Sequence, residues 1–536
     1  MKRKDPSKAA KASRRAALWM GHASCVLVHD GASMVFAGRR ALLEFLTGPR
    51  PFGQIWLTPH SPYDWRVVLP PLLEAGWGLG VAIRKGICSS VRVYRTGDFL
   101  GSEDLDLESG VVWSGRSAAG IVEVPSGLSP REEARATFEA VERLDQMIRG
   151  RYPSVTLGTS LTTTALDIFR TYLEDGVQAN AQVEVSLRHA DAVGGGRQEM
   201  FALPGESVVG AIDLDMASAY PTALASGKIG VEYVGPGTES CYGDPNVITF
   251  AAVEVPDGLV AGPLRYRSAN IEAASCYPTG TVFGAWSGPQ IKAAEAAGCR
   301  VVGVQEVWSF APNDAFARFG EEMMRWRNDL RSYSGTLEVE VCKRLAVQAV
   351  GGWLMSPRER KIVAGEPDDM NGVRILGHGL YEIPVDISPH KNSLVPAGVM
   401  TIGLVQAWSS LVLTGATRKD PSGPIYWHTD GGAFRTREAC HSGLDFAISN
   451  GAPGLDHWKM RYLRRLQVWA PGQRLEEYED GTRRVVGSGI SRSLGEEEVM
   501  RRMRVAEECA EADRKDAGLR IREGKGTRPP RVGEAS

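Results

Sequence analysis

The chain has 536 residues, more than one hydrophobic core normally supports, so several domains are expected. Hydrophobic residues make up 43% and charged residues 24%, as in ordinary soluble globular proteins, and the net charge of −2 neither indicates nor excludes a nucleic-acid partner. No apolar run approaches the roughly 18 residues that span a bilayer. The eight cysteines form no CxxC pair, which argues against a zinc site and favours a reducing, cytoplasmic location.

The first part of the chain predicts a basic tail followed by an α/β domain. Residues 1–16 are rich in Lys and Arg, so we expect them to be disordered. Strand-like and helical patterns then alternate, and one predicted hairpin turns at Asp30-Gly31. A long helix should begin after Ser129, because Glu132 three residues later completes a capping box.

The remaining elements follow a glycine run at residues 194–196. An apolar strand, AIDLDM, leads into a turn and a helix, and two further helices are predicted over residues 313–332 and 338–350. Residues 355–400 predict an irregular or β-type insertion. The segment GVMTIGLVQAWSSLVLTGA predicts a long buried helix, and PIYWHTDGGAF predicts two short strands around a tight turn. Residues 511–536 are charged and Gly-rich, as in a tail.

Aspartates occur at the ends of two of these apolar strands. Asp213 and Asp215 close the strand AIDLDM, and Asp430 lies on the turn of PIYWHTDGGAF. A buried carboxylate is costly unless it is paired or binds a metal ion. For either segment alone, an ordinary Asp-containing turn is the better explanation. Together they favour a site that gathers carboxylates around two Mg²⁺ ions for phosphoryl transfer.

The first of these segments resembles the D-x-x-S-L-Y-P motif of family B DNA polymerases. Residues 215–221 read DMASAYP and depart from the motif only at Ala219. The resemblance implies that Asp215 and the backbone of Met216 bind metal, and that backbone amides from Met216 to Ala219, including Ser218, hold the triphosphate. It also implies that the ring of Tyr220 lies under the incoming sugar and excludes a 2′-hydroxyl.

The second segment resembles the family's Y-x-D-T-D-S motif. Residues 426–431 read YWHTDG, with His428 in place of the first aspartate. The resemblance implies that Asp430 is the other principal metal ligand and that Tyr426, His428 and Thr429 lie near the DNA. His428 is either a plain substitution or a contact to the primer terminus, and the plain substitution is favoured.

Between these segments lies a partial match to the fingers motif K-x-x-x-N-S-x-Y-G. Residues 343–351 read KRLAVQAVG, so that only the first and last positions agree. On a helix, Lys343, Val347 and Val350 would share one face, with the lysine on phosphate and the valines on the base. Arg327 and Arg331, on the preceding helix, would present further cations to the triphosphate. An ordinary solvated helix face is the alternative explanation.

Two further segments extend the resemblance. GGGRQE, which contains Arg197, resembles the glycine-rich link between exonuclease and polymerase modules in the protein-primed branch of the family. RYLRR resembles a thumb-side motif that holds the primer strand, although the K-x-Y of the family is not reproduced. Candidate DNA contacts are therefore Arg197, Arg461, Arg464 and Arg465.

The resemblance implies an α/β multidomain fold. An RNase H-like, exonuclease-like domain is expected over residues 17–190 and a right-hand polymerase domain over residues 191–510. The expected subdomains are a palm over 200–235 and 395–455, insertions over 236–310 and 353–395, fingers over 311–352 and a thumb over 456–510. The family's D-x-E nuclease motif is absent from CVLVHDGASMVFAG, and its second motif has only an echo in HSPYD. We therefore expect an inactive exonuclease fold, with Asp64 as a structural remnant.

The leading prediction is a protein-primed, template-directed DNA polymerase of a phage or linear plasmid. It would use two Mg²⁺ or Mn²⁺ ions, lack proofreading and act as a monomer. Its expected partners are primer-template DNA, deoxynucleoside triphosphates and a terminal protein, without a membrane. Two alternatives stay open: a catalytically weakened polymerase-like protein that binds nucleic acid, and a family B polymerase for repair or primer-independent synthesis. A stand-alone nuclease is least favoured, because the nuclease motifs are the missing ones.

Overall fold

The computed structural model describes residues 15–487 except positions 22, 31, 48–53, 64, 75–76, 85–86, 95–110, 119–120, 123, 126, 159, 174–176, 178–179, 228, 268–274, 334–335, 356–357, 365–369, 371–372, 378–379 and 389–393. Asp64, most of the predicted basic tail and the whole C-terminal tail lie outside the described residues. The chain divides into two compact units. The first comprises Met1–Ile168, Arg327–Gln348 and Ser356–Lys391, and the second comprises Phe169–Trp326, Ala349–Met355 and Asn392–Ser536.

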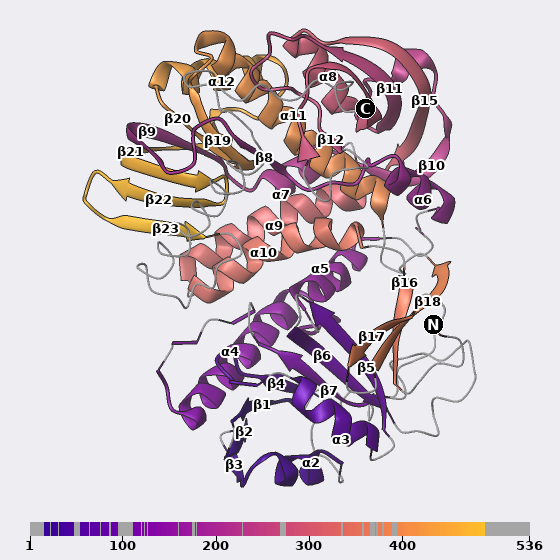
Figure 1. Ribbon diagram of the computed structural model, residues 1–536, viewed down its shortest axis with the longest axis vertical. Coiled ribbons are helices and arrows are strands. Elements are labelled where there is room, and N and C mark those ends of the chain that lie inside the picture. The colour runs from indigo at the N-terminus through magenta and orange to yellow at the C-terminus, as the bar shows by residue number, and fades with distance from the viewer. Residues whose placement is uncertain are drawn as a thin grey trace. The chain divides into compact units, whose positions relative to one another are not determined.

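The first unit contains a seven-stranded sheet with the order β3-β2-β1-β4-β7-β6-β5 (Figure 1). β1, β4 and β7 run parallel, and antiparallel strands extend the sheet on both sides. The predicted hairpin is confirmed, because His29 pairs with Ala32 across the turn at Asp30. The strands are β1 (Arg15–Met20), β2 (Cys25–His29), β3 (Ala32–Phe36), β4 (Gln54–Leu57), β5 (Gly78–Arg84), β6 (Ile87–Tyr94) and β7 (Val111–Ser117).

Helices cover both faces of this sheet, which gives the α/β layering predicted for this region. On one face, α2 (Arg39–Thr47), the 3-10 helix η1 (Trp65–Val68) and α3 (Leu69–Glu74) share a buried apolar core with the strands. On the other face, α4 (Pro130–Arg151) packs Ala134 against Val26 and Val28. The capping box predicted at the start of α4 is present, since Ser129 and Glu132 each bond to the other's backbone.

The prediction of a disordered tail to residue 16 is wrong at its end, because Arg15 opens β1, a strand in the interior of the sheet. Its buried side chain bonds to Asp145 at 2.8 Å, to Glu142 at 3.2 Å and to Gln54 at 3.0 Å. Asp145 also pairs with Arg149 at 2.6 Å. A basic run in the sequence gives no sign of partners that lie 127 residues further on.

The first unit also holds the predicted β-type insertion. β16 (Arg358–Ala364), β17 (Arg374–Gly377) and β18 (Leu380–Ser388) form an antiparallel sheet with the order β16-β18-β17. The two helices predicted upstream are present as α9 (Asp314–Tyr333) and α10 (Thr336–Trp353), and each runs through a boundary between the units. Within the first unit, Thr162 of α5 (Leu161–Arg170) donates a hydrogen bond to Gln348 of α10 at 2.5 Å.

The second unit is centred on another seven-stranded sheet, with the order β23-β22-β21-β9-β20-β19-β8. Its middle strand β9 pairs antiparallel with β20 on one side and with β21 on the other. We call this the central sheet. Its strands are β8 (Arg197–Met200), β9 (Glu206–Met216), β19 (Pro424–Thr429), β20 (Gly431–Phe434), β21 (Trp458–Ala470), β22 (Gln473–Tyr478) and β23 (Arg483–Gly487).

Helices cover one face of the central sheet (Figure 1). Ile212, Leu214 and Met216 of β9 share a core with α7 (Ala219–Ala225), α11 (Val395–Lys419) and α12 (Arg437–Ser449). α11 is long and apolar enough to cross a membrane, which corrects the expectation that no apolar segment approaches that length. However, 94% of its most apolar 18 residues are buried in the protein, as predicted for a core helix. Because side chains alternate along a strand, Asp213 and Asp215 fall on the opposite face.

A four-stranded antiparallel sheet with the order β10-β15-β11-β14 covers the range 236–310 predicted as an insertion and extends beyond it at both ends, since β10 begins at Gly230 and β15 ends at Pro312. α8 (Gly288–Ala297) packs Ile291 and Ala294 on one of its faces. The strands are β10 (Gly230–Pro236), β11 (Val247–Val255), β14 (Gly280–Ser287) and β15 (Arg300–Pro312). Shorter elements of this unit are α6 (Ala181–His189), β12 (Tyr266–Arg267), β13 (Ser275–Cys276) and the 3-10 helices η3 (Glu239–Cys241) and η4 (Leu455–His457).

The described part of the predicted thumb belongs to the central sheet. β21 pairs along most of its length with β9, and β22 and β23 continue the sheet outward. Residues 488–510 of that range lie outside the described residues.

Candidate active site

Asp215 and Asp430 meet at adjoining ends of two neighbouring strands. Asp215 lies opposite Gly431 in the pairing of β9 with β20, and Asp430 immediately precedes Gly431. The amide of Met216 donates to the carbonyl of Asp430 at 3.0 Å, which ties the two segments together. Both aspartates are half-buried. The structure thus brings together the two carboxylates that the sequence predicts as a pair.

Gly431 permits this close approach. A Cβ atom at this position would lie 2.6 Å from the carbonyl oxygen of Leu214 and 3.2 Å from Oδ1 of Asp215. The first distance is shorter than real Cβ contacts allow, and the neighbouring atom is backbone that cannot move aside cheaply. A side chain at Gly431 would therefore push β20 away from β9 and displace one aspartate from the other.

The turn that carries Asp430 is strained and buttressed. Thr429 has a φ of 61°, which is rare for a β-branched residue, and its hydroxyl donates to Oδ1 of Asp430 at 2.6 Å. Gly196 passes directly beside this turn, and a Cβ there would lie 2.9 Å from the Cα of Thr429. The glycine run that the sequence singled out therefore lies against the aspartate turn.

The amides expected to hold the triphosphate are partly in use. Besides the amide of Met216, the amide of Ala217 donates to the carbonyl of His457 at 2.7 Å. This corrects the prediction for Met216 and Ala217 as phosphate-binding amides and leaves Ser218 and Ala219 as candidates. Ser218 has a φ of 59° and precedes the first residue of α7.

Tyr220 lies on α7 and is largely buried. Burial raises its pKa to about 12, and the negative charge of Asp430 adds to this. The hydroxyl therefore stays protonated across the physiological pH range. It lies close enough to Asp430 for the charge of that carboxylate to affect its pKa. This is compatible with a platform beside the carboxylates.

His428 lies in the same cross-strand row as Asp215. His428 pairs with Gly431, Gly431 with Asp215, and Asp215 with Lys459 of β21. Residues directly opposite one another share a face of the sheet. Burial lowers the pKa of His428, and the positive charge of Arg474 lowers it further, so the ring is neutral at physiological pH. It cannot supply the negative charge of the aspartate that it replaces in the family motif.

Lys459 is a member of this row that the motif comparison missed. It is exposed and lies opposite Asp215. The alternation of side chains along KMRYLRR would have put Lys459 on the same face as Arg461. The sequence does not show, however, which residue of this strand lies opposite Asp215.

Asp213 occupies the next row and is engaged by protein groups. Its side chain accepts from the Tyr426 hydroxyl at 3.1 Å, and from Nε of Arg461 at 3.0 Å, with a second guanidinium nitrogen at 2.6 Å. Burial raises the pKa of Asp213, and the charge of Arg461 opposes that rise. With both of its oxygens occupied, Asp213 is not a candidate metal ligand.

These bonds correct one predicted DNA contact and engage the side chain of another. Tyr426 is 1% exposed and directs its hydroxyl to Asp213, so it presents no group to DNA. Arg461 is partly exposed, but its guanidinium is held in the ion pair with Asp213. The motif comparison placed Tyr426 near DNA because it aligns positions along the chain and does not show which face of the sheet a side chain occupies. For Arg461, contact with DNA stays a prediction.

A second correction concerns Arg197. Its side chain is fully buried, bonds to Glu199 and Ser410, and stacks over the ring of Tyr277 at 4.0 Å. Its burial removes it from contact with DNA. It pairs with Thr429 between β8 and β19 and so helps to hold the aspartate turn.

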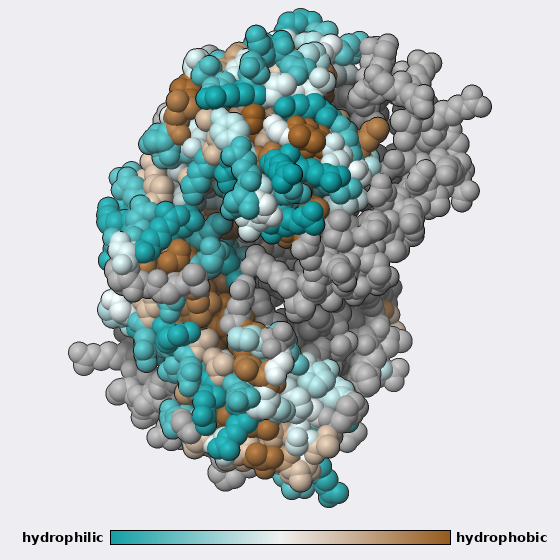
Figure 2. All heavy atoms as spheres, turned by 90° about the vertical axis from the view of Figure 1, so that its left-hand side faces the viewer, coloured by the Kyte–Doolittle hydropathy of each residue, from teal (hydrophilic) through white to brown (hydrophobic). Residues whose placement is uncertain are grey.

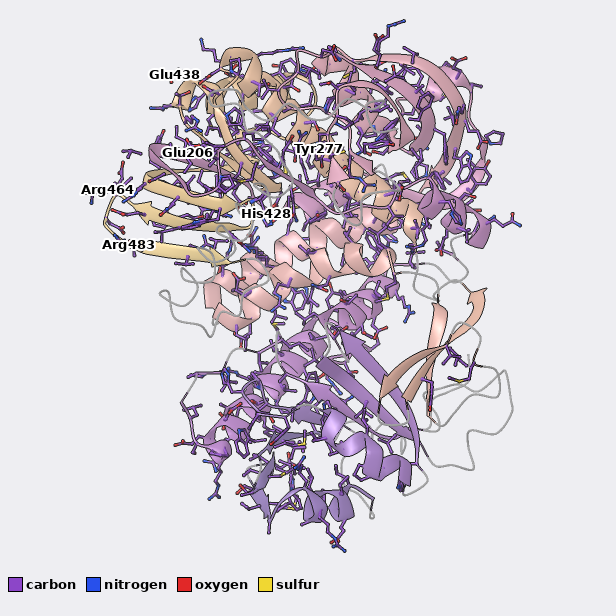
Figure 3. The ribbon with its side chains drawn as sticks, viewed as in Figure 1. Glu206, Tyr277, His428, Glu438, Arg464 and Arg483 are labelled. Atoms are coloured by element: carbon purple, nitrogen blue, oxygen red, sulfur yellow. The ribbon has the colours of Figure 1, made fainter. Side chains whose placement is uncertain are left out.

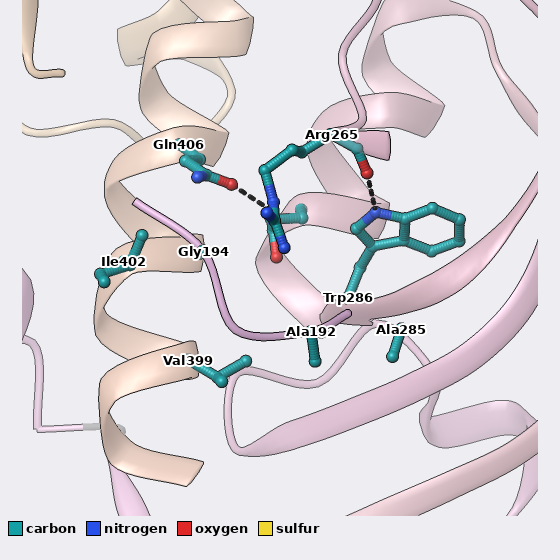
Figure 4. A pocket seen from close by; sticks show the side chains of 10 residues that line it. Ala192, Gly194, Arg265, Ala285, Trp286, Val399, Ile402 and Gln406 are labelled. Carbon is teal, nitrogen blue, oxygen red and sulfur yellow. Dashed lines mark hydrogen bonds between the residues drawn. The ribbon is translucent and has the colours of Figure 1, made fainter. Parts of the chain in front are cut away.

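The glycine run ahead of Arg197 borders a small polar cavity (Figure 4). Gln406 of α11 donates to the carbonyl of Gly195 and accepts from Gln290 at 2.7 Å. Trp286 donates to the carbonyl of Arg265 at 2.9 Å on the far wall. These bonds fix the path of the run across the unit.

The predicted fingers residues are helical as expected, and all but Val350 belong to the first unit. Arg331 of α9 and Lys343 and Val347 of α10 are exposed, and Arg327 is half-buried. Val350 is 1% exposed, so the prediction that it shares an accessible face with Lys343 and Val347 is wrong. The helix turns it into the core.

Arg464 and Arg465 lie further along β21 and are exposed. Arg464 is 3.6 Å from Glu477, and Arg465 donates to Ser207 at 2.7 Å. In Figure 3, Arg464 and Arg483 mark the outer end of the central sheet, apart from His428. On the side of the molecule drawn in Figure 2, apolar residues lie in small groups among hydrophilic ones. Arg464 and Arg465 stay candidates for phosphate contacts.

The donor set at the two aspartates suits one kind of metal. Among the described residues, no three His, Cys, Asp or Glu side chains gather into a metal-binding group. Mg²⁺ is commonly held by one or two carboxylates with water and substrate phosphates completing its shell. Asp215 and Asp430 fit that pattern and do not form a preformed cage.

Comparisons with known proteins agree with this geometry at the level of the fold. No protein-family model and no curated protein sequence matches the chain. Among solved structures, the chain is similar to the orthorhombic crystal form of Phi29 DNA polymerase, at 12% identity and a TM-score of 0.58, covering 88% of this chain and 90% of that one. It is also similar to Phi29 DNA polymerase complexed with primer-template DNA and incoming nucleotide substrates, at 10% identity and a TM-score of 0.60, covering 89% and 92%. The chain has the multidomain α/β fold of a DNA polymerase.

Proposed function

We propose that this protein is a template-directed DNA polymerase that uses Asp215 and Asp430 to hold two catalytic metal ions. The observation that carries the proposal is the pairing of β9 with β20, which brings two half-buried aspartates to adjoining strand ends in a polymerase-like fold. Phi29 DNA polymerase has been solved with primer-template DNA and nucleotide substrates, which supports the same classes of ligand for this chain.

Asp215 and Asp430 would hold the ions through one carboxylate each, with the backbone carbonyl of Met216 as a further oxygen donor. Mg²⁺ or Mn²⁺ bound there would lower the pKa of a primer hydroxyl and neutralise the charge that develops on the leaving phosphate. The residues of the chain supply position: Gly431 keeps the strands close, and Thr429 orients Asp430 through its hydroxyl.

Other residues would select and orient the nucleotide. Tyr220 would lie beneath the sugar, where its ring leaves no room for a 2′-hydroxyl. Arg327, Arg331, Lys343 and Val347 would contact the triphosphate and base, and Arg464 and Arg465 the primer phosphates. Their exposure or partial exposure on helices and strands supports these roles.

We further propose that the protein starts strands from a hydroxyl of a terminal protein, as the family resemblance implies, and replicates a phage or linear-element genome in the host cytoplasm. β11, β14 and most of β15 lie in one of the ranges where insertions are expected in the protein-primed branch. We also propose that the first unit does not proofread. In the described part of that unit, Asp145 and Glu142 are bound to Arg15.

Primer extension tests the polymerase proposal directly. The wild-type protein should extend a primed template with Mg²⁺ or Mn²⁺, and Asp215→Ala or Asp430→Ala should lower the rate at least about 1,000-fold, which corresponds to about 4 kcal/mol of transition-state stabilisation. Failure of the wild type with both metals would overturn the polymerase assignment. Extension that survives Asp430→Ala would overturn the assignment of the site.

The replacement of the motif's first aspartate by His428 supports a second candidate, a polymerase-like protein that binds nucleic acid but has lost most of its activity. The site then holds one negative charge fewer than the family motif provides. A His428→Asp variant separates the two: it should change the rate by less than about tenfold in an active enzyme and restore activity to an inactive one.

A further inference from the structure

Two neighbouring cross-strand rows lie on one face of the central sheet. The first, which we call the aspartate row, contains Asp215, and the second differs from it in composition. Tyr426, Ala433, Asp213 and Arg461 are successive cross-strand partners on β19, β20, β9 and β21. We call these four residues the support row. Each lies two residues along its strand from a member of the aspartate row, His428, Gly431, Asp215 or Lys459.

The support row joins three strands through a single buried carboxylate. Asp213 is 3% exposed, and its two oxygens receive one bond from Tyr426 and two from Arg461. The intervening residue on β20 is Ala433, whose short side chain lets the tyrosine reach across that strand. Removing a charged group from water is costly, and good geometry with several donors is what offsets that cost.

The support row also connects to the strands beyond β21. Arg474 of β22 lies 4.8 Å from the centre of the Tyr426 ring and bonds to the fully buried Glu476 at 2.8 Å. The hydroxyl of Tyr478 donates to the same carboxylate at 2.7 Å. Tyr426 is therefore held on two sides, by Asp213 at its hydroxyl and by Arg474 at its ring.

We infer that Asp213 is a positioning residue that fixes β19 and β21 against β9 and so sets how Asp215 and Asp430 face one another. The inference rests on the proposed function, and Asp213 itself touches neither metal nor substrate. β19 leads directly into the turn that carries Asp430, and Asp215 follows Asp213 by two residues, so a shift of either strand changes the separation of the carboxylates. Groups that orient metal ligands typically contribute about 10-fold to 100-fold to metal affinity or activity.

Tyr426→Phe is the sharpest variant, because it removes one hydrogen bond and leaves the ring in place. In the full-length protein we expect the wild-type unfolding transition, about 10-fold weaker Mn²⁺ binding and about 10-fold lower kcat. Mn²⁺ binding is measured without DNA, from the electron paramagnetic resonance signal of the free ion. Glu254→Gln is the matched control, because it breaks an exposed cross-strand pair with Arg300 in the same unit and should leave both quantities unchanged.

Arg461 separates this role from direct contact with DNA. If Arg461 acts through Asp213, Arg461→Lys should retain Mn²⁺ affinity within about threefold and Arg461→Met should lose about 10-fold. The affinity of both variants for primer-template DNA, and its salt dependence, should match the wild type. A phosphate contact would instead weaken DNA binding and reduce the salt slope by about one in Arg461→Met.

The inference is overturned if Tyr426→Phe folds normally and keeps wild-type Mn²⁺ affinity and kcat. It is also overturned if Arg461→Met changes only the salt slope of DNA binding. Failure of the proposed function has a different signature, in which the wild type extends no primer. The Mn²⁺ titration then still compares Tyr426→Phe with Asp215→Ala, and equal affinity of Tyr426→Phe and wild type would overturn the inference alone.

Discussion

In the first unit, Asp145 lies between Arg15 and Arg149 at 2.8 and 2.6 Å, beside an interior strand of a seven-stranded sheet. In the second unit, Asp215 closes the central strand of another seven-stranded sheet, and Asp430 joins it from the neighbouring hairpin. The first arrangement compensates a buried carboxylate with cations. The second sets two half-buried carboxylates next to each other, which favours a cation from outside the chain.

The difference between these sites comes from position along the strand. Asp145 contacts the start of β1 from α4, inside the layers of its unit, where a structural ion pair is the stable solution. Asp215 and Asp430 lie where strands end and the chain turns, so ligands can approach them. Asp213, two residues further into the sheet, is bound by Arg461 as Asp145 is by Arg15. One strand therefore contains both kinds of carboxylate.

Among substitutions that leave both aspartates in place, the largest effect should come from closing the space between Asp215 and Asp430. Gly431→Val would place side-chain atoms against the backbone of Leu214 and the carboxylate of Asp215. Because a displacement near 1 Å can cost about 100-fold in rate, extension should fall at least that much. Gly303→Ala is the control, since a Cβ there meets no atom within 4 Å. Equal rates for the two variants would show that close strand approach is not required.

A smaller effect is expected at Tyr220. Tyr220→Val should admit ribonucleotides and reduce discrimination against them by roughly 10-fold to 100-fold, the range of about 1.4 to 2.7 kcal/mol. Tyr220→Phe keeps the ring and should keep the discrimination. The ratio of kcat/KM for a deoxynucleotide and its ribonucleotide measures this, and an unchanged ratio in Tyr220→Val would remove the residue from sugar selection.

The compensated carboxylate should matter for stability and not for activity. Burial alone would raise the pKa of Asp145, but bonds from Arg15 and from the Leu157 amide outweigh burial and lower it. Asp145→Asn removes a negative charge beside the buried Arg15. We expect the free energy of unfolding to fall by about 3 kcal/mol at neutral pH. Incorporation per folded molecule should match the wild type.

The pH dependence of this effect has a definite sign. Because the folded pKa of Asp145 lies below its unfolded value, the pair contributes fully above about pH 4 and its contribution is lost as pH falls through the folded pKa. Urea unfolding of wild type and Asp145→Asn should therefore differ most at neutral pH and converge in acid. Glu44→Gln breaks an exposed pair with Arg40 and should show no such difference. A gap that stays constant down to pH 3 would contradict the assignment.

For exonuclease activity we expect no effect of substitution, because we expect the wild type to have none. An end-labelled single strand incubated with excess protein and Mg²⁺ should stay intact, in wild type and in Asp64→Ala alike. Steady trimming from the 3′ end that disappears in Asp64→Ala would show that the first unit is a working exonuclease.

Local signals in the sequence predicted the parts of the fold that depend on nearby residues. The Ser129 capping box, the hairpin at Asp30 and the buried apolar helix at 395–419 need only their own segments, and all are present. The meeting of Asp215 and Asp430 was predicted from motif order, because DMASAYP is nearly intact.

What the sequence could not predict depends on strand register. Asp213 pairs with Arg461 across 248 residues, and Arg197 is buried because β8 packs beside β19. The motif comparison assigned Arg197 and Tyr426 to DNA, because it cannot tell which face of a sheet a residue occupies or how deeply it is buried. Arg15 was misassigned to the tail for a related reason, because its partners Glu142 and Asp145 lie on a helix far along the chain.

Single-nucleotide incorporation tests the central claim most directly. Four primer-templates that differ only in the templating base are each offered one labelled deoxynucleotide at a time with Mg²⁺, using wild type and Asp215→Ala. Our account predicts that the wild type adds the complementary nucleotide on every template and that Asp215→Ala adds none. Addition of the same nucleotide whatever the template, or equal addition by both proteins, would contradict it.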